Sequence, residues 1–342
     1  MTQALPDRPE LAAARLMLEP MGISPADLLD VAPARPCAPT FAEYVPVVSA
    51  AVSPGTRRVY GSYWNRIVQE WGQLRIDEPA PSEIEQLRTQ VQANVVARRN
   101  ARGGRLAAEH LVAALRCLYR QAVADGWIRE SDNPAAKVDK PRRLPSTRRA
   151  IGDARLTEIN EVVANSGDDR DLDTLLIRLH TETACRRGGA LALRVQDLDS
   201  DQCLIFLREK GCTSRWQPVS PTLMRHQLAH HEQRGGGDRG GALLRYRDGR
   251  PLTYRRYDSL WARIGRQLRW VHTQQISTHW LRHTTLTWVE RAFGHAVAKA
   301  YAGHTDSDSA GSTGTYVRAS VQEVAAALAA LTGEDHPLAS DG

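Results

Sequence analysis

The sequence has few cysteines and no arrangement of them that would hold a disulfide framework or a zinc ion. Its five cysteines are scattered, without a C-x-x-C pair, which excludes both kinds of site. No apolar run approaches the ~18 residues of a membrane span. The N-terminus MTQALPDRPELAAARL lacks the basic-then-apolar layout of a secretory signal. We therefore expect a cytoplasmic protein without metal or membrane.

Lysine is also scarce, with 4 residues against 41 arginines, while the formal net charge is +6. A basic balance fits a polyanionic partner, and the planar guanidinium suits bidentate contacts to phosphate. A general bias toward arginine would give the same ratio. Charge alone therefore leaves open both a nucleic-acid partner and an uninformative surface.

The length of 342 residues predicts two domains. A short helical stretch over residues 9–18 is followed by proline-rich sequence, whereas Val59, Tyr63 and Ile67 recur at helical spacing. We expect a partly disordered N-terminal arm (1–39), a small helical domain (40–136), a basic linker (137–149), a second domain (150–332) and a disordered tail (333–342).

The second domain combines helical patterns with one β-hairpin. Leu172, Leu175, Leu176 and Leu179 share one helix face. A strand-like run, Cys203 to Leu207, precedes a second extended run, SRWQPV, and the residues between them are typical of a turn: Glu209, Lys210, Gly211 and Cys212. The predicted fold class is therefore mainly α with a small antiparallel β-sheet.

Four short signatures of the second domain contain residues that could do chemistry. They are TACR ending in Arg186, Lys210 at the hairpin tip, HWLRH with His279 and Arg282, and AGH with His304 before Thr315-Tyr316. Each alone has an ordinary explanation: a surface ion pair, a solvated turn lysine, a common H-x-x-R, a packing tyrosine. With 4 lysines in the chain, a lysine at the hairpin tip is an uncommon coincidence.

The order Arg, Lys, His-x-x-Arg, Gly-His, Tyr resembles the catalytic signature of the tyrosine recombinases, the phage integrase family, over residues 40–332. The resemblance implies a SAM-like core-binding domain and a catalytic domain that close as a C-shaped clamp on DNA. It implies a covalent 3′-phosphotyrosine formed without a cofactor. It assigns catalysis to Arg186, Lys210, His279, Arg282, His304 and Tyr316.

The chemistry of phosphodiester transesterification needs these residue types. Two fixed guanidiniums stabilise the charge that develops on the non-bridging oxygens. A tyrosine hydroxyl has a pKa near ~10, so it needs a proton acceptor, for which His279 is the candidate. Lys210 can protonate the leaving 5′-oxygen, and His304 can hydrogen-bond the phosphate.

The resemblance also implies partners. We expect double-stranded DNA with specific sites, a homotetramer on two sites, and accessory DNA-bending proteins, in the nucleoid. A C-terminal helix is predicted by Ser320 as N-cap and Glu323 in a capping box, with Val321, Val324, Leu328 and Leu331 on one apolar face. It could pack on its own domain, but the resemblance favours docking on a neighbouring subunit. Candidate phosphate contacts are Arg57, Arg58, Arg66, Lys140, Arg142 and Arg143.

Three features depart from the family pattern. Gly189 stands where an acidic residue is usual, and Ala184 where glycine is usual. Glu182 is a carboxylate that could substitute, and the spacing from His304 to Tyr316 is longer than common. The expected function is a site-specific recombinase, an integrase of a mobile element. A resolvase, an invertase, a type IB topoisomerase and a DNA-binding protein with impaired catalysis remain alternatives.

Overall fold

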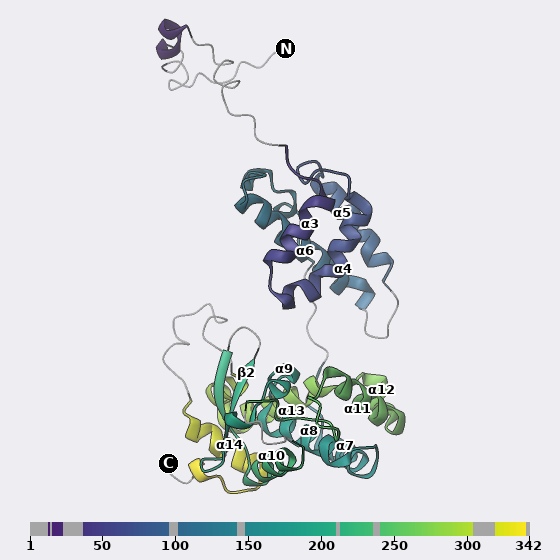
Figure 1. The fold of residues 1–342 in the computed structure, drawn as a ribbon, viewed down its shortest axis with the longest axis vertical. Coiled ribbons are helices and arrows are strands. Elements are labelled where there is room, and N and C mark those ends of the chain that lie inside the picture. Colours follow the sequence, from purple (N-terminus) through teal and green to yellow (C-terminus); the bar gives the residue numbers. More distant parts are fainter. Residues whose placement is uncertain are drawn as a thin grey trace. The chain divides into compact units, whose positions relative to one another are not determined.

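The structure is a computed structural model that divides into two compact units, Met1–Pro145 and Ser146–Gly342 (Figure 1). The described residues are 13, 16–22, 37–95, 102–141, 148–209, 213–234, 240–303 and 319–339. Most of the expected N-terminal arm and part of the expected linker lie outside them.

The described part of the first unit is helical, as predicted. It contains the short turn η1 (Glu19–Met21) and the helices α3 (Phe41–Ala51), α4 (Pro54–Trp71), α5 (Pro81–Ala93) and α6 (Arg105–Ala124). Helix α3 begins where the Thr40 hydroxyl accepts from the Glu43 N–H and the Glu43 carboxylate accepts from the Thr40 N–H. This reciprocal cap satisfies two backbone donors that would otherwise lack partners.

The core of the first unit lies between α4 and α6. Trp64, Ile67 and Trp71 of α4 are buried, and the Trp64 indole donates a hydrogen bond to the carbonyl of Ala114 over 3.1 Å. Tyr119 of α6 is fully buried in the same cluster. The aromatic residues of α4 and α6 are therefore part of the core.

The second unit surrounds one small sheet with helices. Its elements are α7 (Asp153–Asn165), α8 (Arg170–Thr183), α9 (Arg187–Leu191), β1 (Leu198–Asp199), β2 (Leu204–Glu209), β3 (Thr213–Pro218), α10 (Pro221–Arg234), α11 (Tyr254–Gln267), α12 (Arg269–Gln274), α13 (Thr278–Ala302) and α14 (Val321–Thr332). The strands pair antiparallel in the order β1-β2-β3, with Phe206 opposite Trp216. The predicted fold class, mainly α with a small antiparallel sheet, is confirmed.

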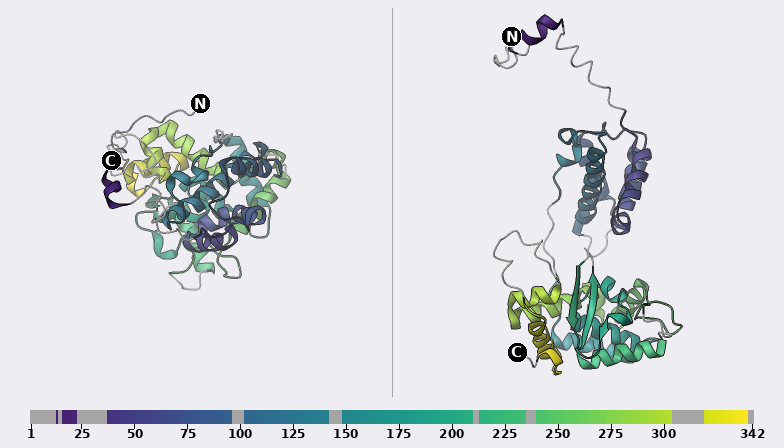
Figure 2. Two further views of the ribbon diagram at one scale, coloured as in Figure 1. Left: turned by 90° about the horizontal axis from the view of Figure 1, so that it is seen from above. Right: turned by 60° about the vertical axis from the view of Figure 1, so that its left-hand side comes forward.

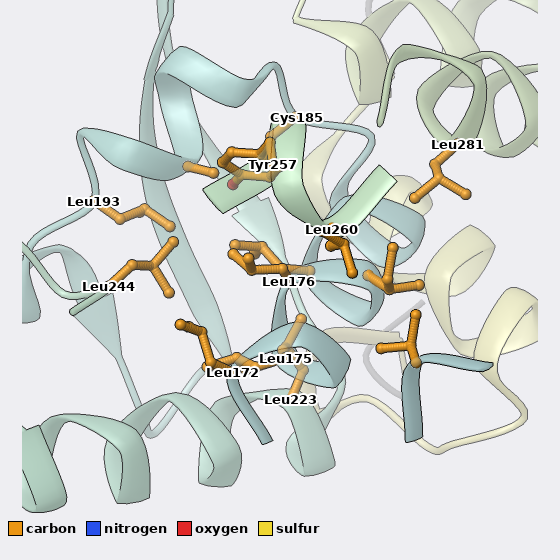
Figure 3. Packing of buried hydrophobic residues seen from close by; sticks show 14 of the residues in the cluster. Leu172, Leu175, Leu176, Cys185, Leu193, Leu223, Leu244, Tyr257, Leu260 and Leu281 are labelled. Carbon is orange, nitrogen blue, oxygen red and sulfur yellow. The ribbon is translucent and has the colours of Figure 1, made fainter. Parts of the chain in front are cut away.

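Helix α8 is the centre of the second unit. Leu172, Leu175 and Leu176 are buried and pack with Tyr257 and Leu260 of α11 in one cluster (Figure 3). The helix also carries a buried carboxylate, Asp173, whose oxygens accept hydrogen bonds from Arg256 and Arg263 of α11. Because a buried charge is tolerated only when it is paired, this network fixes α11 against α8.

Helix α14 begins at the predicted capping box of Ser320 and Glu323. It packs on its own unit beside α13 (Figure 2, right). Val324 and Leu328 are buried there with Val289 and Tyr301 of α13. The segment after the helix is anchored as well, because Glu334 accepts from Arg178 of α8. Val324 and Leu328 are thus used within the chain, whereas Val321 and Leu331 of the same stripe are half-buried, and docking of this helix on a neighbouring subunit stays a prediction.

Candidate active site

The structure describes three of the six expected catalytic residues. Arg186 lies in extended backbone immediately before α9. His279 and Arg282 lie in the first turns of α13, so the H-x-x-R motif is on a helix. Lys210, His304 and Tyr316 lie outside the described residues, and their assignments stay predictions.

A tight turn at the end of α8 sets the direction of Arg186. Ala184 ends the helix with φ 50 and ψ 21, in the left-handed region that side chains disfavour. Both backbone polar groups of the next residue, Cys185, have partners. Its N–H donates to the Thr183 hydroxyl, and its carbonyl oxygen lies 3.0 Å from Nδ1 of the buried His180. The turn is therefore rigid without the usual glycine.

Arg186 is held by a carboxylate from the sheet. Its Nη1 lies 2.8 Å from Oε2 of Glu209, and its backbone N–H donates to Oε1 of the same residue over 2.5 Å. The Arg186 side chain is 36% exposed, whereas the Glu209 side chain is fully buried. One face of the guanidinium is thus fixed while the side chain stays accessible to a ligand.

Arg282 is buried and held by backbone carbonyls. It donates one hydrogen bond to the carbonyl of Ala184 and another, of 2.8 Å, to the carbonyl of Ala302. Burial and the positive charge of Arg186 lower its pKa to about 10, which leaves it charged at neutral pH. Arg282 therefore links the turn before Arg186 to the end of α13.

Arg215 of β3 is a third arginine at this site, and no sequence pattern pointed to it. Its Nη1 lies 2.9 Å from Glu209 Oε2, and its Nη2 lies 3.4 Å from the Thr183 carbonyl. Its guanidinium also lies against Gly303, where a Cβ atom would overlap it and where φ is +64. The backbone conformation therefore favours glycine before His304, and a larger residue there would also displace the Arg215 guanidinium.

His279 is exposed and surrounded by positive charge. Burial of part of its ring, followed by the charges of Arg148, Arg282, His283 and Arg186, lowers its pKa below the usual value for histidine. Each of these groups disfavours the imidazolium. The ring is therefore neutral at physiological pH, the state that a proton acceptor requires.

Glu182, the carboxylate that could have replaced an acid at position 189, has other partners. It accepts from Arg178 over 2.6 Å and from the Ser220 hydroxyl over 2.9 Å. The carboxylate that does contact Arg186 is Glu209, which the sequence pattern placed in the turn and which ends strand β2. The hairpin register, not the local sequence, brings it to Arg186.

The candidate phosphate contacts of the first unit have mixed surroundings. Arg57 donates to two backbone carbonyls in the last turn of α3, Arg66 pairs with Glu70, and Lys140 pairs with Glu109. Arg58 is exposed. Arg142 and Arg143 lie outside the described residues. Exposed pairs of this kind contribute little to stability and can exchange partners, so the structure neither selects nor excludes them as DNA contacts.

Across the part of the chain that the structure describes, no helix is long and apolar enough to cross a membrane.

Comparisons with known proteins give the family of this chain. The sequence model of the phage integrase family matches residues 154–323. The chain belongs to this family, the tyrosine recombinases. No curated protein sequence matches the chain.

Solved structures with a similar fold include those of two integrases. Lambda integrase, as a dimer bound to a core site, is 15% identical with a TM-score of 0.59, over 79% of this chain and 97% of that one. Lambda integrase as a tetramer on a Holliday junction is 14% identical with a TM-score of 0.59, over 91% and 92%. The Tn1549 transposon integrase with circular intermediate DNA is 16% identical with a TM-score of 0.60, over 82% and 95%.

Proposed function

We propose that the chain is a site-specific DNA recombinase that cuts and rejoins DNA through a covalent phosphotyrosine. The observation that carries the proposal is the meeting of Arg186 and Arg282 beside a neutral His279, because the charge of each arginine lowers the pKa of that histidine. Two fixed cations and one proton acceptor are what in-line attack on a phosphodiester requires.

In the first step, the Tyr316 oxygen attacks the phosphorus of the scissile phosphodiester. The new bond joins the tyrosine oxygen to phosphorus, and the bond from phosphorus to the 5′-oxygen breaks. The tyrosine proton passes to His279, and Lys210 gives a proton to the leaving 5′-oxygen. Arg186 and Arg282 stabilise the negative charge on the non-bridging oxygens, and His304 donates a hydrogen bond to the phosphate.

In the second step, a 5′-hydroxyl of another strand attacks the 3′-phosphotyrosine and displaces the tyrosine. The number of phosphoester bonds is the same before and after, so no nucleotide hydrolysis is needed. The chemistry reverses with the same groups: the residue that accepted a proton returns it to the tyrosine. Strand exchange follows when the attacking hydroxyl belongs to a different duplex.

We propose further that residues 40–136 form a DNA-binding domain, that residues 150–332 form the catalytic domain, and that the enzyme acts as a tetramer on two sites. Support comes from the solved relatives, which include an integrase tetramer on a Holliday junction. Integration of a mobile element is the proposed biological role, in keeping with the phage and transposon origin of the similar structures. Resolution or inversion would use the same chemistry.

The test must not require a known target sequence. The full chain is expressed in cells, the cells are lysed in denaturant, and DNA that stays attached to the protein is captured and sequenced. The wild type should enrich discrete sites, and Tyr316→Phe should enrich none, because it lacks only the attacking oxygen. Equal recovery of DNA from both proteins would refute the proposal.

The captured site then gives a defined substrate. A duplex of that sequence with a nick close to the cleavage point loses the short strand that carries the 5′-hydroxyl, so the covalent adduct accumulates. Wild type should form it, while Tyr316→Phe should bind the same duplex with equal affinity and form no adduct. Adduct formation by the phenylalanine variant would mean that another residue is the nucleophile.

A second candidate, a DNA-binding protein without cleavage, rests on the absence of an acidic residue at position 189. The contact of Glu209 with Arg186 speaks against this reading, because a carboxylate does reach the arginine. Binding to captured sites without any adduct, by the wild type, would favour it.

A further inference from the structure

Glu209 is the one carboxylate, among the described residues, with a recorded contact to Arg186. Its Oε1 accepts from the Arg186 backbone N–H over 2.5 Å, and its Oε2 accepts from Arg186 Nη1 over 2.8 Å. The same Oε2 accepts from Arg215 Nη1 over 2.9 Å. A single buried side chain thus fixes both the backbone and the guanidinium of Arg186.

The glycine at position 189 makes room for this carboxylate. A Cβ on Gly189 would lie 3.1 Å from Glu209 Cγ and 3.3 Å from Oε1, tighter than ordinary contact. Position 189 is one turn into α9, directly beside the Arg186–Glu209 pair. A side chain there and the carboxylate of Glu209 therefore compete for one space, and this chain fills that space from strand β2.

The charges around Glu209 explain why it can be buried. Burial raises the pKa of its carboxyl, but Arg215, the Arg186 N–H and Arg282 outweigh this, and its pKa falls below the usual value. A buried charge with several donors of this kind is costly to remove, because its partners then lack a counter-charge. Arg186, Arg215 and Arg282 would repel one another without it.

We infer that Glu209 is a positioning residue of the proposed recombinase, and that with Gly189 it does from the sheet what a carboxylate on α9 would do. It holds one edge of Arg186, so that the exposed remainder of the guanidinium faces the scissile phosphate. The inference rests on the proposed function.

The first test measures single-turnover cleavage of the nicked duplex at saturating protein. Glu209→Gln keeps the size of the side chain and removes its charge. It should cleave about 10- to 100-fold more slowly, the range expected when a group that binds the transition state is misplaced by about an ångström. Its affinity for DNA should stay close to that of the wild type, whereas its melting temperature should fall, because three arginines lose a buried counter-charge.

The matched control is Asp197→Asn. Asp197 is also buried, and it holds a half-exposed arginine through contacts of 2.5 and 2.7 Å. That arginine is Arg208, the neighbour of Glu209 in strand β2. It has no recorded contact with Arg186. This variant should cleave at the wild-type rate under saturating conditions. An equal loss of rate in both variants would mean that Glu209 is only a structural counter-charge, which overturns the inference.

Coupling to Arg186 separates positioning from a general effect. If Glu209 acts through Arg186, the double variant Arg186→Ala with Glu209→Gln should cleave no more slowly than Arg186→Ala alone. A double variant whose loss of rate is the product of the two single losses would overturn the inference.

Moving the carboxylate to α9 gives an independent test. Glu209→Ala should cleave slowly, and adding Gly189→Glu should restore much of the rate. Gly189→Glu alone should be impaired by crowding.

Comparing Glu209→Ala with and without Gly189→Glu also tests the inference if Glu209→Gln folds poorly, because the expected result is a gain of activity. Absence of any restoration by Gly189→Glu in the Glu209→Ala background would count against the inference. Failure of the proposed function would give a different result, because the wild type would then form no adduct at all. Wild-type adduct formation with an unimpaired Glu209→Gln variant would refute the inference alone.

Discussion

Arg282 donates a hydrogen bond of 2.8 Å to the carbonyl oxygen of Ala302, although both belong to the range of helix α13. In a straight helix, residues 20 positions apart would be separated by about 30 Å. The contact is possible because the helix is broken at Gly294, whose φ of 85 and ψ of 172 are not helical. The break turns the chain back, so that the residue before Gly303 returns to the arginine.

Gly294→Ala should therefore damage both stability and activity. The backbone conformation of Gly294 belongs to a region that is essentially restricted to glycine, and forcing another residue into it costs about 1–3 kcal/mol. Relief by straightening the helix would carry Ala302 away from Arg282. We expect a lower melting temperature and a large loss of single-turnover cleavage on the captured site.

The control is Gly333→Ala, at the end of α14. Gly333 also has positive φ, +69, and a Cβ there would meet nothing within 4 Å. It should lose a similar amount of stability and cleave at the wild-type rate. Normal cleavage by Gly294→Ala would show that the break in α13 has no part in building the site.

Arg282→Lys should lose more than a conservative change suggests. An ammonium group presents one charge centre and cannot reach both the Ala184 and the Ala302 carbonyls as the planar guanidinium does. Loss of a donor that stabilises developing charge typically costs ~10²–10³ in rate. The comparison is Arg250→Lys, an exposed arginine paired with Asp248, for which cleavage rate and melting temperature should not change.

The pH dependence of cleavage should report His279. Its imidazole must be neutral to accept the tyrosine proton, so the rate falls as pH drops through the pKa of His279. Because that pKa is lowered, by burial and then by Arg148 and other cations, the half-maximal rate should lie below pH ~6.5, the usual value for histidine. Single-turnover rates between acidic and neutral pH measure this limb.

Arg148→Gln tests the cause of that shift. Removing a nearby positive charge makes the imidazolium less unfavourable, so the pKa of His279 rises and the acid limb moves to higher pH. Arg155→Gln, an exposed arginine paired with Glu158, is the matched control and should leave the limb in place. An unmoved limb in the Arg148 variant would argue that a group other than His279 limits the rate at low pH.

The parts of the structure that local sequence determines were predictable. The leucine spacing of α8 and the capping box of Ser320 and Glu323 depend on residues a few positions apart. Such patterns act through hydrogen bonds and contacts within one turn. For these elements the structure confirmed the expectation.

Contacts between distant segments could not be predicted in the same way. Glu209 was assigned to a turn, and its pairing with Arg186 depends on the hairpin register and on the space at Gly189. No sequence pattern pointed to Arg215, because it reaches the site only through the pairing of its strand, β3, with β2. The stripe of α14 was predicted correctly, but an apolar stripe indicates that a partner exists and not whether that partner is the same chain.

Because α14 packs within its own unit, Leu328→Ala should destabilise the single chain. Leu328 is fully buried, and truncation of a buried leucine typically costs ~2–5 kcal/mol. Leu331→Ala, at a half-buried position of the same helix, should cost less. Unfolding in denaturant measures both.

Deletion of residues 320–342 should weaken binding to one DNA site as well as pairing of two sites, because it removes α14 from the core of its own unit. Intact binding to a single site would contradict the packing.

Lys210 is proposed as the acid that protonates the departing 5′-oxygen, and this role has a specific chemical signature. General acid catalysis of this kind contributes ~10²–10⁴-fold, so Lys210→Ala should slow cleavage by about that factor while DNA affinity stays nearly unchanged. A substrate in which sulfur replaces the bridging 5′-oxygen releases a thiolate, whose conjugate acid has a pKa near the ~8.5 of cysteine.

Such a leaving group needs no proton, so the Lys210→Ala defect should largely disappear on the sulfur substrate. The defects of Arg186 and Arg282 variants should persist on it, because charge still develops on the non-bridging oxygens. The two substrates therefore separate proton donation from charge stabilisation within one set of variants. A Lys210→Ala defect of equal size on both substrates would mean that this lysine positions DNA and that another group protonates the 5′-oxygen.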